Sequence, residues 1–342
     1  MNEEDTRWIQ SIDEADISDT TKSQYIRNLA TLKKLANGRA LRDVITHPGA
    51  MKRRIESAYT SLQTRKAMMA SIKALLKYNP EVADELADHV EHWNLMFRTT
   101  DRAIQERVAT AEPTEREILN WVPWPDVLAK ERELAATKYG SIDHLLLAMY
   151  CLIEPIRADF GHVRLVTDAG MLDTIKHENF MYLSRKSGES QLVLHTYKTS
   201  KKYGRFQRTL PDPLVRVIIA SLQDFPRPYL FVNDVGNPYD KKNSFVRFVN
   251  RALARLFGKN LTISLLRHSF ISNIDFNTST PAKLFKHSRH MMHGIGQQQL
   301  YRRHIPAMKI ERVSPESTTS SSSSTPPTKD VTTNDEGRVM YI

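Results

Sequence analysis

The sequence predicts a mainly α-helical protein with a small antiparallel β-sheet, an α+β fold. Three observations lead to this prediction. Apolar residues recur at helical spacing from residue 5 to residue 95, with no strand pattern before residue 160. Four short strand-like segments follow between residues 163 and 209, and helical spacing returns between residues 213 and 303. At 342 residues, the chain is long enough for two domains.

The N-terminal part is predicted to be a set of helices joined by short links. Residues 22–34 carry apolar side chains three or four positions apart, and Thr64 opens a second segment of the same kind. Pro80 ends this second helix and starts a third over residues 81–97. These segments together predict an all-helical domain over residues 1–97.

The rest of the chain is predicted to form a linker, a second domain and a tail. Residues 98–117 are polar and indicate a linker or linking helix, whereas residues 118–312 hold all the predicted strands. The strands are expected at residues 163–166, 180–184, 191–196 and 206–209, and the helices at residues 124–138, 141–153, 213–223, 242–256, 264–273 and 281–303. Residues 313–342 are rich in Ser, Thr and Pro, which is typical of a disordered segment.

The charge distribution indicates a polyanionic partner. The chain carries a formal net charge of +10, and because residues 313–342 carry −2, residues 1–312 carry +12. A folded body this basic favours binding to nucleic acid. The alternative is a basic surface that only keeps the protein soluble.

The composition also excludes several classes of protein. The single cysteine, Cys151, excludes a disulfide framework and suits a reducing, intracellular setting. The longest apolar run, residues 145–153, is too short to span a bilayer. The acidic N-terminus lacks the apolar region of a signal peptide. We therefore expect an intracellular protein with no membrane partner.

Four stretches contain side chains that are suited to chemistry, and each also has a purely structural explanation. Arg157 can cap the helix before it, and Lys198 lies in a turn rich in lysine that solvent alone can explain. Arg267 lies on a helix whose other residues resemble a core, and Tyr301 can be an ordinary interface aromatic. Taken singly, none of the four predicts a function.

Taken together, these side chains fit the cleavage of a phosphodiester without a metal. Two arginines can bind the non-bridging oxygens through their planar forks. A tyrosine can attack phosphorus and hold the cut end as a phosphotyrosine, and because its free pKa is about 10, nearby cations must favour the phenolate. A lysine can donate the proton that the leaving 5′ oxygen needs. The chain supplies this set in order: Arg157, Lys198, Arg267, a histidine and Tyr301.

This order resembles the catalytic domain of the tyrosine recombinases, also called phage-type integrases. The stretch Leu266-Arg267-His268-Ser269-Phe270 is similar to the family's Leu-Arg-His-Ser-Phe motif. The stretch Glu154-Pro155-Ile156-Arg157-Ala158-Asp159-Phe160 is similar to a variant found in recombinases of large DNA viruses, virophages and eukaryotic transposons. Residues 197–204 fit the hairpin in which the family keeps its lysine. The resemblance covers about residues 118–305, and residues 1–97 more loosely resemble the family's core-binding (SAM-like) DNA-binding domain.

The resemblance implies a role for each residue. Arg157 and Arg267 would clamp the scissile phosphate. Lys198 would be the general acid, with Lys201 as the alternative. His293 would hydrogen-bond the phosphate or assist proton transfer, and Tyr301 would attack to form a 3′-phosphotyrosine. The remaining polar residues would support the site (Ser264, His268 and His290) or bind DNA (Lys202, Arg205, Arg302 and Arg303).

Two positions depart from the family pattern. Many members have a histidine three residues before the second arginine, where this chain has Ser264, which cannot shuttle a proton at neutral pH. The last histidine of the family usually precedes the tyrosine by nine positions, whereas His293 precedes Tyr301 by eight and His290 by eleven. The glycines between His293 and Tyr301 are expected to break the helix and let the tyrosine reach the phosphate.

A zinc site formed by the histidines near Tyr301 is an alternative. His287, His290 and His293 are spaced three residues apart, with His304 nearby. On one straight helix the first and last of the three would point apart, and no carboxylate or cysteine joins them. We therefore predict neither a metal nor another cofactor.

The resemblance implies a site-specific recombinase or integrase of a viral genome or mobile element. Its partner would be double-stranded DNA, with four protomers at a synapse of two duplexes and no need for ATP. Two alternatives stay open. A type IB topoisomerase usually has Ser-Lys where this chain has Gln297-Gln298. The other alternative is a catalytically silent DNA-binding protein on the same fold.

Overall fold

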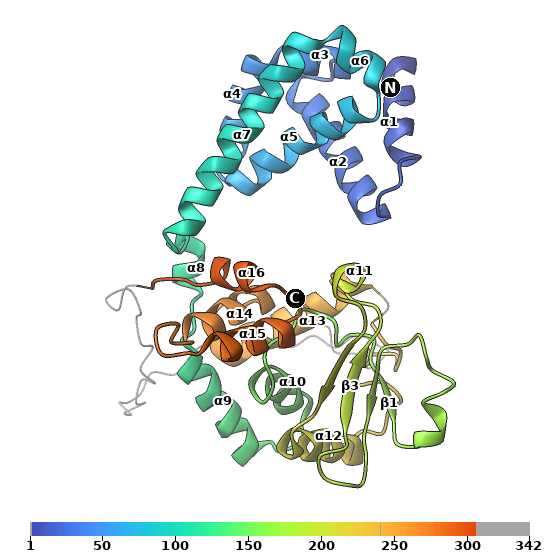
Figure 1. Cartoon of the computed structure of the whole chain (residues 1–342), viewed down its shortest axis with the longest axis vertical. Helices are drawn as coiled ribbons and strands as arrows, with labels where there is room; N and C mark the ends of the chain where they lie inside the picture. Colours follow the sequence, from blue (N-terminus) through green and yellow to red (C-terminus); the bar gives the residue numbers. More distant parts are fainter. Residues whose placement is uncertain (1, 240, 306–342) are drawn as a thin grey trace, which may run out of the picture. The chain divides into compact units, whose positions relative to one another are not determined.

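The structure is a computed structural model that describes residues 2–239 and 241–305. Most of these residues are helical and the strands form one four-stranded sheet, so the predicted fold class is confirmed (Figure 1). The described residues belong to one compact unit. Among the described residues, no helix is both long and apolar enough to cross a membrane. The tail predicted at residues 313–342 lies outside the described residues.

From residue 2 to residue 109 the only regular secondary structure is helical. Its helices share a hydrophobic core in which Trp8 and Trp93 are fully buried. The indole Nε1 of Trp93 donates a hydrogen bond to the Ile45 carbonyl oxygen at 3.0 Å, so the polar group of this buried side chain is satisfied. The helices are α1 (Glu3–Asp13), α2 (Asp19–Leu35), α3 (Leu41–Thr46), α4 (Pro48–Ala58), α5 (Leu62–Lys77), α6 (Pro80–Glu85) and α7 (Ala87–Ala109).

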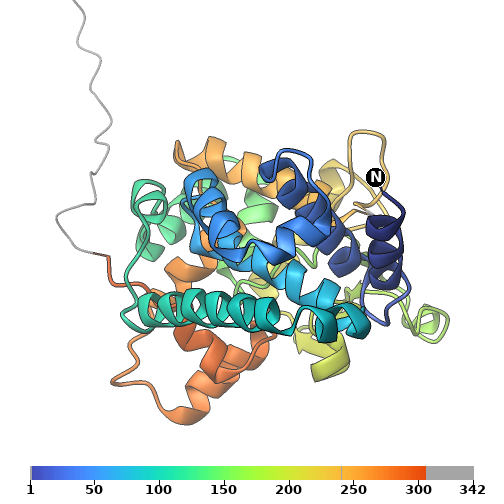
Figure 2. The same cartoon turned by 90° about the horizontal axis from the view of Figure 1, so that it is seen from above.

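One helix of this part differs from the prediction. The helix expected over residues 81–97 is interrupted at Leu86, which leaves helical geometry with φ −107° and ψ 29° while its side chain stays in the core. From Ala87 the chain continues as α7 to Ala109, through most of the segment expected as a linker; this long helix is prominent in Figure 2. Residues 98–109 are therefore helical.

The second part of the chain has its own hydrophobic core, built around α10 (Ile142–Cys151). Every residue of this helix from His144 to Tyr150 is buried, which explains the long apolar run in the sequence: this helix is surrounded by protein on all sides. α9 (Trp124–Thr137) packs against it. The short α8 (Glu115–Leu119) precedes both and starts with a capping box in which Thr114 and Glu117 exchange hydrogen bonds.

The sheet is mixed, whereas the sequence predicted an antiparallel one. Its strands lie in the order β1 (Arg164–Val166), β2 (Phe180–Tyr182), β3 (Gln191–Leu194) and β4 (Phe206–Thr209). The pairs β2–β3 and β3–β4 are antiparallel, but β1 pairs with β2 in parallel. Residues 167–179, which include the 3₁₀ helix Ala169–Met171, form the connection from β1 to β2. A connection of this length is sufficient to return the chain for parallel pairing.

The connection from β3 to β4 contains a short helix that the sequence analysis did not predict. α11 (Ser200–Tyr203) lies at the end of this hairpin (Figure 1). Gly204, with φ +67°, ends the helical turn in a backbone conformation that L-residues with side chains rarely adopt. Lys201 and Lys202 therefore lie on a helical turn, whereas Lys198 lies in the turn just before it.

Five further helices complete the described chain: α12 (Asp212–Asp224), α13 (Lys242–Phe257), α14 (Ile263–Ser272), α15 (Pro281–His290) and α16 (Ile295–Leu300). The helix predicted over residues 281–303 is thus divided in two, as expected from its glycines. Gly294 is the N-cap of α16, but the left-handed residue of the break is Met292, with φ 55°. Met292 is 2% exposed and belongs to the core around α10, so burial of its side chain stabilises this unfavourable backbone conformation.

Candidate active site around Tyr301

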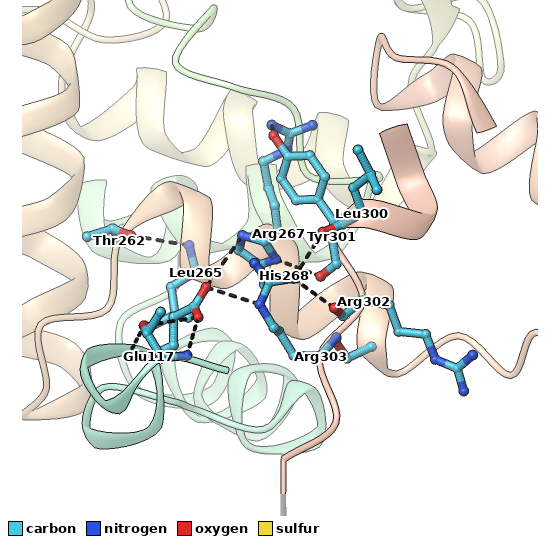
Figure 3. A network of polar contacts seen from close by, with 11 residues as sticks. Glu117, Thr262, Leu265, Arg267, His268, Leu300, Tyr301, Arg302 and Arg303 are labelled. Carbon is cyan, nitrogen blue, oxygen red and sulfur yellow. Dashed lines mark hydrogen bonds and ion pairs between the residues drawn. The ribbon is translucent and has the colours of Figure 1, made fainter. Parts of the chain in front are cut away.

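Tyr301 lies at the C-terminal end of α16 and contacts Arg267 from α14 (Figure 3). The Nη1 group of Arg267 donates a hydrogen bond to the Tyr301 hydroxyl oxygen at 3.2 Å. The guanidinium carbon lies 4.8 Å from the centre of the tyrosine ring. A cationic donor directed at an oxygen stabilises negative charge on that oxygen. The structure thus brings together the predicted nucleophile and one of the two predicted arginines, 34 residues apart in sequence.

Arg267 is held in place by main-chain carbonyls. Its side chain is only 1% exposed; Nε donates to the Pro155 oxygen at 3.1 Å, and Nη2 donates to the Met291 oxygen at 3.4 Å. Burial lowers the pKa of Arg267 from its ordinary value, and the nearby charge of Arg157 acts in the same direction. Arginine still stays protonated because its ordinary pKa is so high. A buried, orientated cation therefore faces the tyrosine oxygen.

Arg157, the second predicted arginine, reaches the same turn. Its Nη1 donates to the Met292 carbonyl oxygen at 3.4 Å, and the Thr199 hydroxyl donates to the same oxygen at 3.1 Å. The carbonyls of Met291 and Met292 thus accept hydrogen bonds from Arg267, from Arg157 and from Thr199, which lies on the hairpin that contains Lys198. The turn between α15 and α16 is the place where the predicted catalytic segments meet.

His293 is the histidine that lies beside the tyrosine. Its ring is parallel to the Tyr301 ring within 3°, with 5.6 Å between ring centres, and the residue is 3% exposed. Nδ1 lies 3.1 Å from the Gly294 oxygen, and because a carbonyl only accepts, Nδ1 must carry the proton. Nε2 is buried with no hydrogen-bond partner among the described residues.

The protonation state of His293 follows from its burial. Burial lowers its pKa to about 4, and the positive charges of Arg267 and Arg157 add to this effect against the opposing hydrogen bond to Gly294. Near pH 7 the ring is therefore neutral, with its lone pair on Nε2. In this state His293 can accept a proton but cannot donate one from Nε2.

His290, the alternative histidine, belongs to a different cluster. Its Nδ1 lies 3.1 Å from Glu154 Oε2, and Nδ1 of His287 lies 3.0 Å from Glu154 Oε1. Neither histidine shares a ring contact with Tyr301 in the described part of the chain. Within those residues, no group of three or more His, Cys, Asp or Glu side chains has the arrangement to hold a metal ion.

His268 also packs on the tyrosine (Figure 3). Its ring centre is 4.7 Å from that of Tyr301, and its Nδ1 lies 2.6 Å from the Tyr301 carbonyl oxygen. Its Nε2 lies 3.9 Å from Glu117 Oε1. Burial, followed by the charge of Arg303, lowers the pKa of His268 to about 4. These contacts hold the main chain of Tyr301, so they fit the supporting role that the sequence predicted.

The residues after Tyr301 make different contacts from each other. The Arg302 guanidinium lies over the Phe276 ring at 5.3 Å. Arg303 is engaged inside the protein: Nε donates to Glu117 Oε1 at 3.2 Å, and Nη1 donates to the Leu300 and Arg302 oxygens at 2.9 and 2.8 Å. These contacts disfavour the prediction that Arg303 binds DNA. They also show that Arg267, rather than Arg302 or Arg303, is the cation hydrogen-bonded to the tyrosine hydroxyl.

Ser264 does not contact the tyrosine among the described residues. It is exposed on α14 and borders a separate pocket of about 280 Å³ together with Glu117, Asn260 and His268. This position is on the same helix as Arg267, three residues earlier, but the Ser264 side chain makes no hydrogen bond within the described chain. Its predicted supporting role stays a prediction.

The lysines of the hairpin are at the surface. Lys198 is exposed and borders a pocket of about 500 Å³, and it makes no hydrogen bond or ion pair with the described residues. Lys201 is also exposed, and the Lys202 ammonium lies over the Tyr203 ring at 5.5 Å. Arg205 borders a different pocket, of about 250 Å³, which it shares with Arg289, His290 and His293. In the described part of the chain Lys198 thus makes no polar contact with the cluster around Tyr301, although the neighbouring Thr199 contacts that cluster.

Two carboxylates of the site were not singled out as functional from the sequence. Glu117 binds Arg303 and His268, and Glu154 binds His287 and His290. The motif Thr114-x-x-Glu117 gives a helix-start signal, but a capping box contains no information about a partner 186 residues away. Glu154 lies inside the stretch that resembles the family motif, and only the fold reveals that α15 returns to it.

The two buried histidines predict a stability that decreases in mild acid. Because the pKa of His268 and of His293 is about 4 in the folded protein, below the ordinary 6.5, the unfolded chain binds more protons between these values. Their contribution is complete above pH 6.5 and is lost as the pH falls toward 4, with a slope of about 1.4 kcal/mol per pH unit for each histidine. The lowered pKa values of Glu117 and Glu154 act only below their ordinary 4.5.

Urea unfolding between pH 7.5 and 5 measures the effect of the histidines without that of Glu117 and Glu154, because the pKa of both carboxyl groups lies below this range. We expect the free energy of unfolding to decrease over this range. The double variant His268→Asn/His293→Asn should show a flatter profile. An equally steep profile in the double variant would show that other groups cause the pH dependence.

Comparisons with known proteins add little to this geometry. No protein-family model matches the chain, and a search of curated proteins finds no match. Among solved structures, the chain is similar to the crystal structure of XerA recombinase, with a TM-score of 0.38 and 14% sequence identity. That match covers 90% of this chain and 96% of the other. At this identity and TM-score, the similarity does not assign an activity.

Proposed function

We propose that this protein is a site-specific DNA recombinase or integrase that cuts and rejoins DNA through a covalent 3′-phosphotyrosine on Tyr301. The observation that carries the proposal is the contact of the Tyr301 hydroxyl with the buried Arg267 guanidinium, 3.2 Å apart, beside the parallel ring of His293. Three distant segments, around residues 155, 267 and 291–301, converge on this point. A purely structural tyrosine does not require a buried cation and a neutral histidine together.

The proposed reaction uses these groups as follows. The Tyr301 oxygen attacks phosphorus, and the bond between phosphorus and the 5′ oxygen breaks. The Nε2 lone pair of His293 takes the phenolic proton. Arg267 and Arg157 stabilise the charge on the non-bridging oxygens by exchanging main-chain carbonyls for phosphate oxygens. Lys198 gives a proton to the 5′ oxygen, which requires the exposed hairpin to move toward the DNA. Attack of a 5′ hydroxyl on the phosphotyrosine reverses the sequence and rejoins a strand.

The basic surface supports double-stranded DNA as the partner. Residues 1–312 carry a net charge of +12, and Arg205, Lys201 and Lys202 lie exposed on the hairpin near the site. Contacts from such side chains to DNA phosphates make affinity fall steeply with salt concentration. Strand exchange between two duplexes requires four active sites, so we propose a homotetramer at the synapse. The DNA of a viral genome or mobile element is the proposed substrate.

The deciding experiment is to trap the covalent intermediate. The full chain is incubated with nicked duplexes that lose a short 5′ fragment on cleavage, so that religation is prevented. The proposal expects a protein–DNA adduct without added metal or ATP, with the nucleotide mapped to Tyr301 by mass spectrometry. An adduct on another residue contradicts the mechanism.

The same preparation separates the two alternative functions. Relaxation of supercoiled plasmid that lacks a cognate site would indicate a topoisomerase. Salt-dependent DNA binding without an adduct on any duplex would indicate a catalytically silent DNA-binding protein.

A further inference from the structure

Glu154 joins three segments of the chain through one carboxylate. Its Oε1 lies 3.0 Å from Nδ1 of His287, and its Oε2 lies 3.1 Å from Nδ1 of His290, both on α15. The Arg208 Nη1 on β4 lies 2.6 Å from the same Oε2. The side chains of Glu154 and Arg208 are each 12% exposed, so this is a largely buried charge cluster. Its disruption would leave a partly buried charge without a partner.

Each of these segments leads directly to a group of the proposed active site. Glu154 lies three residues before Arg157 and directly before Pro155, whose carbonyl binds Arg267. α15 ends at His290, three residues before His293. β4 follows the hairpin that contains Lys198. A change in the position of the carboxylate is therefore transmitted to the turn at which the proposed catalytic segments meet.

The contacts also set the chemical state of the cluster. A carboxylate only accepts hydrogen bonds, so Nδ1 of each histidine carries a proton. Burial raises the pKa of Glu154, but the hydrogen bond from His290 and the charge of Arg208 outweigh burial and hold that pKa below its usual range. His290 and His293 both line the pocket of about 250 Å³. A carboxylate in this arrangement fixes both the orientation and the tautomer of an imidazole.

We propose that Glu154 is a positioning residue for strand cleavage: its carboxylate holds α15 so that the following turn presents His293 parallel to Tyr301. Glu154 touches no reacting atom. The inference rests on the proposed function for its effect on cleavage, but its effect on the position of His293 is independent of that function.

The test compares Glu154→Gln with Glu131→Gln. Glu131 is a suitable control because its Oε1 lies 3.4 Å from Nε2 of the buried His144, in helices α9 and α10, away from the tyrosine. Both variants remove a buried carboxylate that faces a histidine. We expect the single-turnover cleavage rate of Glu154→Gln to decrease about 10- to 100-fold, by analogy with carboxylates that orient metal-ligating histidines. Its dissociation constant for duplex DNA should stay within about twofold of the wild type, and Glu131→Gln should cleave normally.

A double variant separates positioning from the effect of an unpaired arginine. Glu154→Gln/Arg208→Gln removes both charges, so it should be more stable than Glu154→Gln alone. Its cleavage rate should stay low, because α15 is still not held by a carboxylate. Recovery of the rate in the double variant would overturn the proposal, and so would equal rates for Glu154→Gln and Glu131→Gln.

A spectroscopic measurement keeps the inference testable if no variant cleaves DNA. With ¹⁵N-labelled histidine, the wild type should show Nδ1–H tautomers at His287 and His290 and a nuclear Overhauser effect between the rings of His293 and Tyr301. Glu154→Gln should lose that ring contact, whereas Glu131→Gln should keep it. An intact contact in Glu154→Gln overturns the proposal. Absence of cleavage in the wild type, by contrast, contradicts only the proposed function.

Discussion

Tyr301→Phe is expected to abolish the covalent protein–DNA adduct completely. Phenylalanine retains the ring that packs between His268 and His293, at 4.7 and 5.6 Å, but it removes the oxygen that would attack phosphorus. The variant should fold, because within the described residues the only side-chain hydrogen bond that it loses is the one from Arg267. We expect a loss of stability of about 1–2 kcal/mol from that bond. The measurement is the amount of adduct on a nicked duplex, together with the free energy of unfolding in urea.

Tyr229→Phe is the matched control for this substitution. Tyr229 is also half-buried beside a histidine, with 5.4 Å between its ring centre and that of His162. The Tyr229→Phe variant should form the covalent adduct on Tyr301 at the wild-type rate. An adduct in Tyr301→Phe would show that another side chain is the nucleophile.

Arg267→Lys is expected to lower the cleavage rate about 10²- to 10³-fold, a loss typical of one preorganised donor to a developing oxyanion. Lysine keeps the charge but not the planar fork, so it cannot bind the Pro155 and Met291 carbonyls and the tyrosine oxygen at the same time. Affinity for duplex DNA should change little, because a buried side chain contributes less to DNA binding than the exposed lysines and arginines. Single-turnover cleavage and equilibrium binding at one salt concentration separate the two effects.

Arg227→Lys provides the corresponding control. Arg227 is a partly buried arginine that, like Arg267, binds main-chain carbonyls, with Nε donating to Leu230 at 3.0 Å and Nη1 donating to Phe225 at 2.8 Å. Burial lowers its pKa as it does for Arg267. This variant should lose stability but keep its cleavage rate. Equal losses of cleavage in both variants would indicate a general effect of destabilisation.

The elements with strong local patterns were predictable from the sequence. β4 matches its predicted bounds, and α10 and α13 lie within one or two residues of theirs, because their apolar spacing continues over the whole element. The parallel pairing of β1 with β2 was missed because three-residue strands contain no information about strand direction. α11 was missed because four residues between two strands are too few to show helical periodicity.

The same distinction applies to the site. The residue types at Arg157, Arg267 and Tyr301 are demanding enough to be selected together from the sequence, and the structure places Arg267 against Tyr301 and both arginines at one turn. The hydrogen-bond partners of the two arginines include main-chain carbonyls, and the sequence does not show which carbonyls the fold brings close. Which of His290 and His293 lies beside Tyr301 also depended on the fold, because α15 ends at His290, which contacts Glu154, and the next turn places His293 on the tyrosine ring. Lys198 stays a prediction, since it is exposed and makes no polar contact with the other residues of the described chain.

The left-handed turn at Met292 gives the site a mechanical property. A glycine would adopt this conformation without strain, but it would have no side chain to anchor. Methionine is buried at 2% exposure among the residues that surround α10, while its carbonyl oxygen accepts hydrogen bonds from Arg157 and Thr199. The turn is thus attached to the hydrophobic interior on one side and to the proposed reaction centre on the other. The turn therefore restrains the groups that surround the tyrosine, although the tyrosine itself lies near the end of the described chain.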